Sequence, residues 1–452
     1  MYFFIFILLF TFTYSYSIIR LPFKRKITDS KNITSDNFAN IFFESNYYTE
    51  ITIGSTNQKL PMRLSFGNYH TFITISKYTG NFTKYDPLQS ATYQKTYGER
   101  IFSNINIIRG INSKEKFTLK TINNKDIFCN NIDFILATIP KMNISGDFGM
   151  SLSTKDEYLN RLLDFSFITN LYNKNYIKYK IFSINFFNKN EGEIIIGGKA
   201  NEYSNYDIGY FIEDYIPVNK NGYFWGLLNL VSSLNGNNLF FQKQSAIFSI
   251  ESYVIKPHYS YIEKINELFF NEQLENKKCI FVNKSIDYSF YHCDKNINLK
   301  NFPTLYLYQR IFNYTFELNS KDLFEDIGER KYFLMNFADD DSNDKWVLGQ
   351  PFLKKYNFTY NFDTKTVGMY LGIEDGQKSE KPKSDGKKYV VIWIIVIIIC
   401  LVIIIILGKV KFSIVKKVPK EKVNELEIFF KYEEKKDNIE KNNINDKNNI
   451  NN

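Results

Sequence analysis

Few polar side chains of this 452-residue chain are spaced for chemistry. Glu251 lies two residues after Ser249, and His70 lies five residues after Ser65. A lone carboxylate can move a proton, and a serine beside a histidine can act as a nucleophile. No G-x-S-x-G turn presents either serine. Because isolated candidates rarely make a site, we expect Glu251 and His70 to be solvated loop residues.

The sequence offers little for a metal or another cofactor. Its three histidines are scattered, and no C-x-x-C pair accompanies them. An acidic run, Asp339 to Asp341, is interpreted as a solvated hairpin tip, with a weak cation site as the alternative. We therefore expect no metal and no cofactor.

Both ends of the chain carry membrane-targeting signals. Residues 1–17, MYFFIFILLFTFTYSYS, are typical of a secretory signal peptide. Residues 389–407 contain no charge, and as a helix they would span about 28 Å, the thickness of a bilayer core. Lysines follow this segment at once, which favours a cytosolic C-terminus. The sequence predicts a single-pass protein whose bulk is extracellular or lumenal, at the plasma membrane or in an endolysosomal vesicle.

The net charge of +9 is concentrated at the edges of the chain. Residues 18–30, the polar stalk at 376–388 and the tail at 408–452 each carry +3. The long middle is therefore near neutral, which disfavours a nucleic-acid partner. The tail is rich in Asn, Lys and Glu without apolar periodicity, so we expect it to be disordered and cytosolic.

Secretion gives two further expectations. Six Asn-X-Ser/Thr sequons are glycosylation candidates: Asn32, Asn81, Asn143, Asn283, Asn313 and Asn357. Cys279 and Cys293 lie 14 residues apart, where an oxidising lumen permits a disulfide; two reduced, buried thiols are the alternative. Four cysteines in all exclude a disulfide-built scaffold.

The middle of the chain is typical of an all-β protein. Short runs rich in Ile, Phe, Tyr and Thr, bounded by Gly, Asn and Asp, recur from residue 46 to 372. Two helices are predicted, after Thr154 and after Pro257; in the second, Ile262, Ile265, Leu268 and Phe269 would share a face. The two halves repeat one order of motifs: MRLSFGN is followed by GDFGM in the first, and AIFSIES is followed by WVLGQPF in the second. This repetition indicates a duplicated architecture.

These motifs resemble the pepsin-like aspartic peptidases. YYTEITIGSTNQKLPMRLSFGN is similar to the opening strands that lead into "F-D-T-G-S", and SGDFGM resembles "D-G-I-L-G-L". EGEIIIGG resembles "G-x-L-x-x-GG", and WVLGQPFLKKYNFTYNFDTKTVGMY resembles "W-I-L-G-x-x-F-L-R" and its continuation. The cysteine pair followed by FPTLYLY is similar to the disulfide of the second lobe and the strand after it.

The resemblance implies a bilobal, mainly β acid-protease fold with few short helices, here with one transmembrane helix. It implies a short pro-like segment at 18–46, an N-terminal β lobe at 47–200 and a C-terminal β lobe at 201–375. Signal, lobes, span and tail together are similar to the membrane-anchored members of the family.

The departures from the family bear on activity. The family's chemistry needs two aspartates that share a proton, and the equivalent positions here are Ser65 and Ser249. Glu251 replaces the glycine after the second aspartate, and residues 101–117 lack the flap motif "Y-G-x-G". No catalytic residue is therefore intact, and Gly67, Asn68, Glu251 and Ser252 remain as candidate cleft residues.

Three functions fit these observations. The first is an inactive pepsin-like domain that binds an extended peptide or a protein in its cleft. The second is an active aspartic endopeptidase with a displaced dyad, which would need two carboxylates converging in the cleft. The third is a structural surface-coat protein that keeps only the fold.

Overall fold

A computed structural model describes a β-rich body within the compact unit Met1–Glu374. The described residues are 16–25, 46–75, 83–103, 107–137, 145–152, 166–198, 210–216, 218–219, 222–234, 237–238, 244–258, 261–285, 288–337 and 345–371. Residues 1–15 of the predicted signal peptide lie outside them, as do the stalk, the membrane segment, the tail, most of the pro-like segment and the boundary at 200/201.

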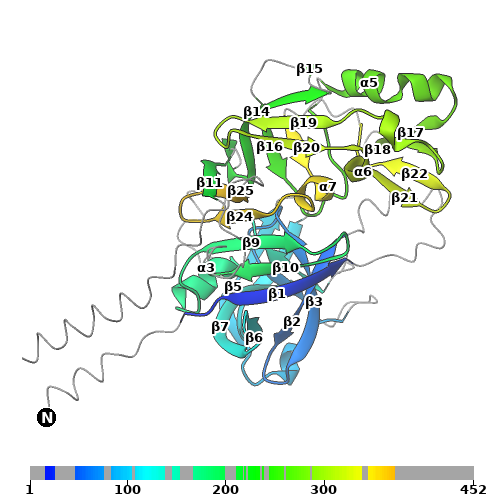
Figure 1. Ribbon diagram of the computed structural model, residues 1–452. Helices are drawn as coiled ribbons and strands as arrows, with labels where there is room; N and C mark the ends of the chain where they lie inside the picture. Colours follow the sequence, from blue (N-terminus) through cyan, green and yellow to red (C-terminus); the bar gives the residue numbers. More distant parts are fainter. Residues whose placement is uncertain are drawn as a thin grey trace, which may run out of the picture. The chain divides into compact units, whose positions relative to one another are not determined.

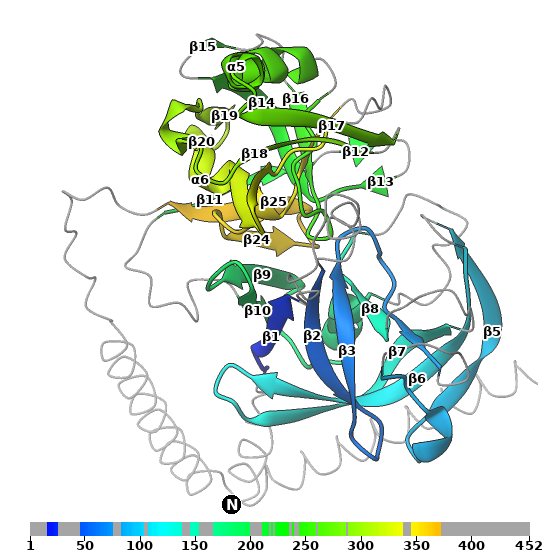
Figure 2. The ribbon, with the colours of Figure 1, turned by 90° about the vertical axis from the view of Figure 1, so that its right-hand side faces the viewer.

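The first half of the molecule, which we define as the elements up to β10, is built almost entirely of strands. They are β1 (Ile19–Arg25), β2 (Tyr47–Ile53), β3 (Gln58–Ser65), β4 (Phe72–Thr74), β5 (Gln94–Ser103), β6 (Ile107–Thr121), β7 (Asp126–Ala137), β8 (Gly146–Gly149), β9 (Ile181–Phe186) and β10 (Glu191–Ile196), with the 3₁₀ turn η2 (Pro87–Gln89) and the helix α3 (Phe167–Asn173). Figure 2 shows β2 and β3 side by side, with the long strands β5, β6 and β7 beyond them.

The second half, from β11 onward, has more and shorter strands. They are β11 (Tyr210–Tyr215), β12 (Val218–Asn219), β13 (Gly222–Tyr223), β14 (Gly226–Leu234), β15 (Asn237–Asn238), β16 (Gln244–Phe248), β17 (Cys279–Ser285), β18 (Tyr288–Asp294), β19 (Leu305–Gln309), β20 (Tyr314–Leu318), β21 (Phe324–Ile327), β22 (Arg330–Phe333), β23 (Trp346–Leu348), β24 (Phe358–Asn361) and β25 (Thr366–Leu371). Its helices are α5 (Ile262–Glu275), α6 (Ser320–Leu323), α7 (Gln350–Leu353) and the 3₁₀ turn η4 (Leu299–Asn301).

The two halves share one sheet. A 13-stranded sheet runs β11-β25-β24-β9-β10-β1-β2-β3-β8-β4-β7-β6-β5, so that β24 of the second half pairs with β9 of the first. In Figure 1 these neighbours run side by side, from yellow β24 through green β9 and β10 to blue β1. Phe182 stacks on Tyr360 across the β9–β24 pair, with ring centroids 4.5 Å apart. The remaining strands of the second half form sheets of six, four and two strands.

Strand β1 is a central member of this sheet. It pairs with β10 on one side and with β2 on the other. Ile19, Leu21 and Phe23 alternate with more exposed residues and are at most 3% exposed. Residues 19–25, which the sequence assigned to a pro-like segment, are therefore an integral strand of the described fold.

The predicted all-β class and duplicated architecture are confirmed, whereas the helices differ in detail. Helix α3 begins at Phe167, after the Ser166 cap, while residues 153–165 lie outside the described structure. Helix α5 follows Pro257 as predicted, and Ile265 and Phe269 are buried. Leu268 was wrongly placed with them: it is 49% exposed, because it lies at the edge of the apolar stripe.

Candidate functional site

Ser65 stands at the end of β3, where this strand meets β8. The two strands are parallel, with Ser65 opposite Gly149, and Met150 N donates to Ser65 O at 2.9 Å. A side chain at Gly149 would meet His70 O at 2.6 Å, so a glycine is needed where β8 passes close to the backbone of Tyr69 and His70. This packing holds Ser65 almost fully buried, with its hydroxyl directed toward the second half.

Ser249 stands in the equivalent place in the second half. It follows β16, which is parallel to β23, and Ser249 N donates to Leu348 O at 3.1 Å. Gly349 follows β23, and a side chain there would meet Val254 O at 2.2 Å. The same strand pair and the same close glycine therefore position both serines.

Each serine closes a turn with its own hydroxyl. Ser65 Oγ accepts from Asn68 N at 3.1 Å, and Ser249 Oγ accepts from Ser252 N at 3.1 Å. Such serine turns fix the side-chain oxygen relative to the backbone. Because each oxygen accepts within its own turn, each hydroxyl can donate its proton elsewhere, and both donate to Glu251.

The Glu251 carboxylate bridges the two halves. Its Oε1 accepts from Ser65 Oγ at 2.6 Å and from Gly67 N at 2.8 Å, while its Oε2 accepts from Ser249 Oγ at 3.2 Å. Gly67 is exposed, and Ser249 and Glu251 are partly exposed, so solvent reaches one side of the group. Glu251 is therefore more than the solvated loop residue that the sequence suggested, because three donors converge on its partly exposed carboxylate.

A buried ion pair lies next to this site. Arg63 donates to both carboxylate oxygens of Asp147, at 2.6 and 2.7 Å, and Asp147 is fully buried. Asn68 Nδ2 also donates to Asp147. Burial raises the pKa of Asp147, and the Arg63 guanidinium opposes that shift. Asp147 therefore orients Asn68 from behind and does not face a ligand.

This arrangement supplies one accessible carboxylate. Peptide hydrolysis by the pepsin mechanism needs a base that takes a proton from water and an acid that gives one to the carbonyl in the same step. Glu251 can hold one of these roles at a time. Among the described residues, the only other carboxylate tied to the site is that of Asp147, whose two oxygens accept from Arg63 and Asn68.

The structure brings together most of the residues selected from the sequence, but not all. Ser65, Ser249, Glu251, Gly67 and Asn68 meet directly, and Ser252 supports Ser249. His70 packs its ring against Tyr69 at 5.0 Å, and the single Ser65 proton is given to Glu251, so a Ser65–His70 nucleophile is not formed.

Sequence reasoning missed Arg63 and Asp147. The available signal was a charged residue inside each of two otherwise apolar strand motifs, MRLSFGN and GDFGM.

The flap region forms a hairpin of β5 and β6, in register from Glu99 with Ile111 to Ser103 with Ile107.

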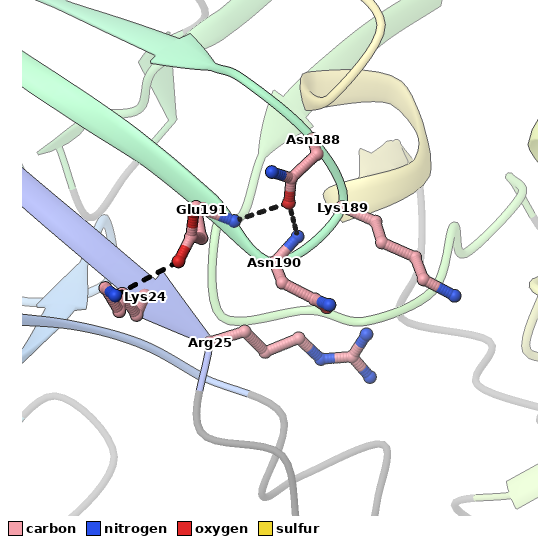
Figure 3. A pocket seen from close by; sticks show the side chains of 6 residues that line it. All are labelled: Lys24, Arg25, Asn188, Lys189, Asn190 and Glu191. Atoms are coloured by element: carbon pink, nitrogen blue, oxygen red, sulfur yellow. Dashed lines mark hydrogen bonds and ion pairs between the residues drawn. The ribbon is translucent and has the colours of Figure 1, made fainter.

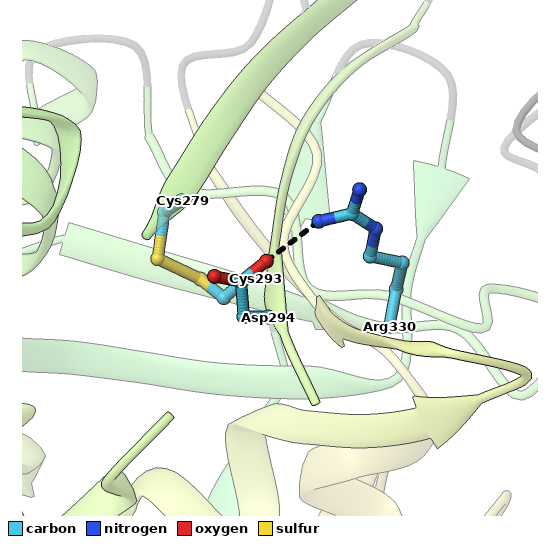
Figure 4. Close-up of a disulfide and its surroundings, with 4 residues drawn as sticks. All are labelled: Cys279, Cys293, Asp294 and Arg330. Atoms are coloured by element: carbon cyan, nitrogen blue, oxygen red, sulfur yellow. Dashed lines mark hydrogen bonds and ion pairs between the residues drawn. A yellow bond between two sulfur atoms is a disulfide. The ribbon is translucent and has the colours of Figure 1, made fainter. Parts of the chain in front are cut away.

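The predicted disulfide is confirmed. Cys279 and Cys293 are bonded and lie opposite each other on β17 and β18. Figure 4 shows the bridge beside Asp294, which pairs with Arg330 at 2.7 Å. Cys129 is a buried free thiol, and burial raises its pKa to about 12, which makes it unreactive.

The structure describes some, but not all, of the other surface residues selected from the sequence. Asn313 and Asn357 are exposed, and Asn283 lies on β17. Asn32, Asn81, Asn143 and the acidic run at 339–341 lie outside the described residues. The part of the chain that the structure describes contains no cluster of three metal-binding side chains and no helix long and apolar enough to span a bilayer.

Comparison with known proteins agrees with this architecture. The family model "Eukaryotic aspartyl protease" matches residues 46–370. Among solved structures, the chain is similar to basic 7S globulin from soybean, with a TM-score of 0.59 and 12% identity over 78% of this chain and 95% of that one. At this identity the likeness concerns the fold alone. No curated protein matches the chain.

Proposed function

Residues 46–370 make this chain a member of the eukaryotic aspartyl protease family, and from that premise we propose that it is a catalytically inactive, membrane-anchored member that binds an extended peptide or protein segment. One observation carries the proposal. The Glu251 carboxylate accepts from both serines at the family's aspartate positions, so one acid stands where the reaction requires two.

The hydrogen bonds around Glu251 favour binding over hydrolysis. Its carboxylate accepts from three donors contributed by both halves, and such bonds to a charged acceptor are the strong ones. A general base must instead be ready to take up a proton from water. The site is thus arranged to hold one fixed negative charge between the halves.

The surroundings of Glu251 suit a peptide ligand. Gly67 is exposed beside the carboxylate, and the hairpin of β5 and β6 corresponds in sequence to the family's flap. An extended segment bound here would gain backbone hydrogen bonds from strand ends, and side-chain pockets would set its specificity. The negative charge of Glu251 favours a ligand with a basic side chain at this point.

Membrane anchoring and secretion complete the proposal. The signal at 1–17, the apolar segment at 389–407 and the lysines after it support a single-pass protein with the described domain outside the cytosol. The disulfide between Cys279 and Cys293 supports an oxidising compartment, either the cell surface or an endolysosomal vesicle. Sequons at Asn313 and Asn357 are exposed, as glycosylation requires.

The test compares peptide cleavage and peptide binding by the full-length protein in detergent. A mixed library of fluorescent peptides, incubated from acid to neutral pH, should show no turnover, whereas equilibrium binding should enrich extended basic peptides. Turnover that disappears with Ser65→Ala would overturn the proposal in favour of an active enzyme. A protein that binds no peptide at all would support the structural-coat alternative.

Restoration of the two catalytic aspartates provides a second test of the proposal. Ser65→Asp and Ser249→Asp place acids at both family positions, but Glu251 would remain as a third carboxylate between them. We therefore expect hydrolysis only from the triple variant that also carries Glu251→Gly, with the double variant as its matched control. An inert triple variant that still binds peptide would mean that the framework can bind but cannot be returned to catalysis.

A further inference from the structure

A cavity of about 510 Å³ opens at the end of β1, beside the turn between β9 and β10. Its lining residues are Lys24, Arg25, Asn188, Lys189, Asn190 and Glu191. Figure 3 shows Arg25 and Lys189 extending to the same side of the turn, while Lys24 faces Glu191. The lining therefore contains three cations and one carboxylate.

Among the described residues, the cations around this cavity outnumber the acids that pair with them. Lys24 pairs with Glu191 at 3.1 Å. Arg25 and Lys189 both pair with Glu325 of β21, at 3.8 and 3.3 Å. Arg25 is held firmly, since its side chain is only 8% exposed and lies over the Tyr253 ring at 4.3 Å. A cation excess around a fixed guanidinium attracts a further negative group.

A fourth cation, Lys354, lies beside this cluster. Its Nζ is 5.4 Å from the Tyr253 ring centre and 5.9 Å from that of Tyr47. Among the described residues, no carboxylate is within ion-pairing distance of Lys354 Nζ. Burial lowers the pKa of Lys354 to about 7, with Arg25 and Lys189 lowering it further and Glu325 opposing them.

We propose that this cavity binds a tetrahedral oxyanion, a phosphate or sulfate group either free or carried on a larger ligand. The Arg25 guanidinium supplies a fixed positive charge at the cavity wall, and Lys24 and Lys189 supply two ammonium groups. Asn188 adds a donor: its Oδ1 accepts from Asn190 N at 2.8 Å and Glu191 N at 3.1 Å, which leaves Nδ2 as its donor end. The bound anion competes with Glu325 for Arg25 and Lys189.

Binding is coupled to protonation of Lys354. An anion beside Arg25 and Lys189 cancels the repulsion that these cations exert on the Lys354 ammonium, so Lys354 takes up a proton near neutral pH. The groups that face Lys354 are Arg25, Lys189 and Glu325, together with the Tyr47 and Tyr253 rings. The protein should therefore bind the anion more tightly at pH 6 than at pH 8.

Isothermal titration calorimetry of the full-length protein in detergent tests the proposal, with sodium sulfate and sodium phosphate as probes at constant ionic strength. We expect saturable binding that weakens by about tenfold in Lys189→Ala and in Arg25→Gln. Glu325→Gln removes the competing acid and should tighten binding. Lys59→Ala, which removes an exposed lysine that does not line the cavity, is the control and should leave binding unchanged.

The proton linkage is measured with sulfate, which does not titrate in this range. Heats recorded in two buffers of different ionisation enthalpy should reveal proton uptake at pH 7, and Lys354→Met should abolish the uptake while sulfate still binds. The proposal is overturned if neither anion binds saturably, or if Lys189→Ala and Glu325→Gln both bind like the unaltered protein. Lys189 is on an exposed turn, so its variant is expected to fold.

Discussion

In the first half of the molecule, the strand pair that carries Ser65 sets Arg63 opposite Asp147. In the second half, the pair that carries Ser249 sets Ile247 opposite Val347 at the equivalent register. The parallel strand pairing, the close glycines and the serine turns recur in both halves. The duplicated framework therefore rests on main-chain geometry, which leaves side chains at matching positions free to diverge into an ion pair or an apolar pair.

The largest effect should come from breaking the ion pair. Arg63→Ile or Asp147→Val alone leaves a buried charge without its partner, which should cost about 3–5 kcal/mol. The double variant copies the apolar pair of the second half and should be near neutral or more stable. Urea unfolding followed by tryptophan fluorescence measures both.

Arg330→Ile is the matched control for the ion pair. Arg330 pairs with Asp294 on the surface, and loss of this pair should cost less than about 1 kcal/mol. If the double variant proved as unstable as either single variant, the charges themselves, and not only their mutual balance, would be required in the first half.

A second difference between the halves is the covalent link in the second. Cys279 and Cys293 close a short loop there, whereas the first half has only the buried thiol of Cys129. Replacement of both bridge cysteines by serine should cost about 3 kcal/mol by loop entropy. Thermal unfolding measures this loss, and alkylation of native protein should leave Cys129 unmodified. Labelling of Cys129 in the folded state would contradict its assigned burial.

A third difference is the residue two positions after each serine, Gly67 in one half and Glu251 in the other. Glu251→Gln keeps the shape but removes the charge on which Ser65, Gly67 and Ser249 converge, and should cost about 1–3 kcal/mol. Unfolding at pH 7 is the measurement, with the exposed Glu263→Gln as control. An unchanged stability would mean that the three hydrogen bonds add nothing across the two halves.

The remaining effect concerns pH. The pKa of Lys354, which caps α7 in the second half, is lowered in the fold to about 7, so above that pH the folded state holds fewer protons than the unfolded state. Stability should therefore rise with pH between about 7 and 10, and the stabilisation gained over this range should be fully lost below about pH 7. Lys354→Met should flatten this slope. A slope that persists in this variant would assign it to other groups.

The sequence predicts the strands well because their apolar alternation is local. Strand β1 was not among them: residues 19–25 were assigned to a pro-like segment, because their place in the sheet depends on pairing with distant strands. Ser65 and Ser249 could be aligned from their flanking strands. Their contact with Glu251 could not, because Ser65 and Glu251 are 186 residues apart and no periodicity relates them. The partnership of Arg63 with Asp147 likewise appears only when the register of β3 and β8 is known.

The shared sheet also bears on how the chain is made. Strand β9 pairs with β24, so Ile184 must wait until Phe358 has been synthesised before its hydrogen bonds are complete. Until then the nascent first half exposes an unpaired apolar edge, which invites aggregation and needs protection. Contacts of such long sequence separation also slow folding. Completion of the sheet is thus a late step, which can follow only after β24 has been synthesised, and a chain truncated before β24 would leave that edge open.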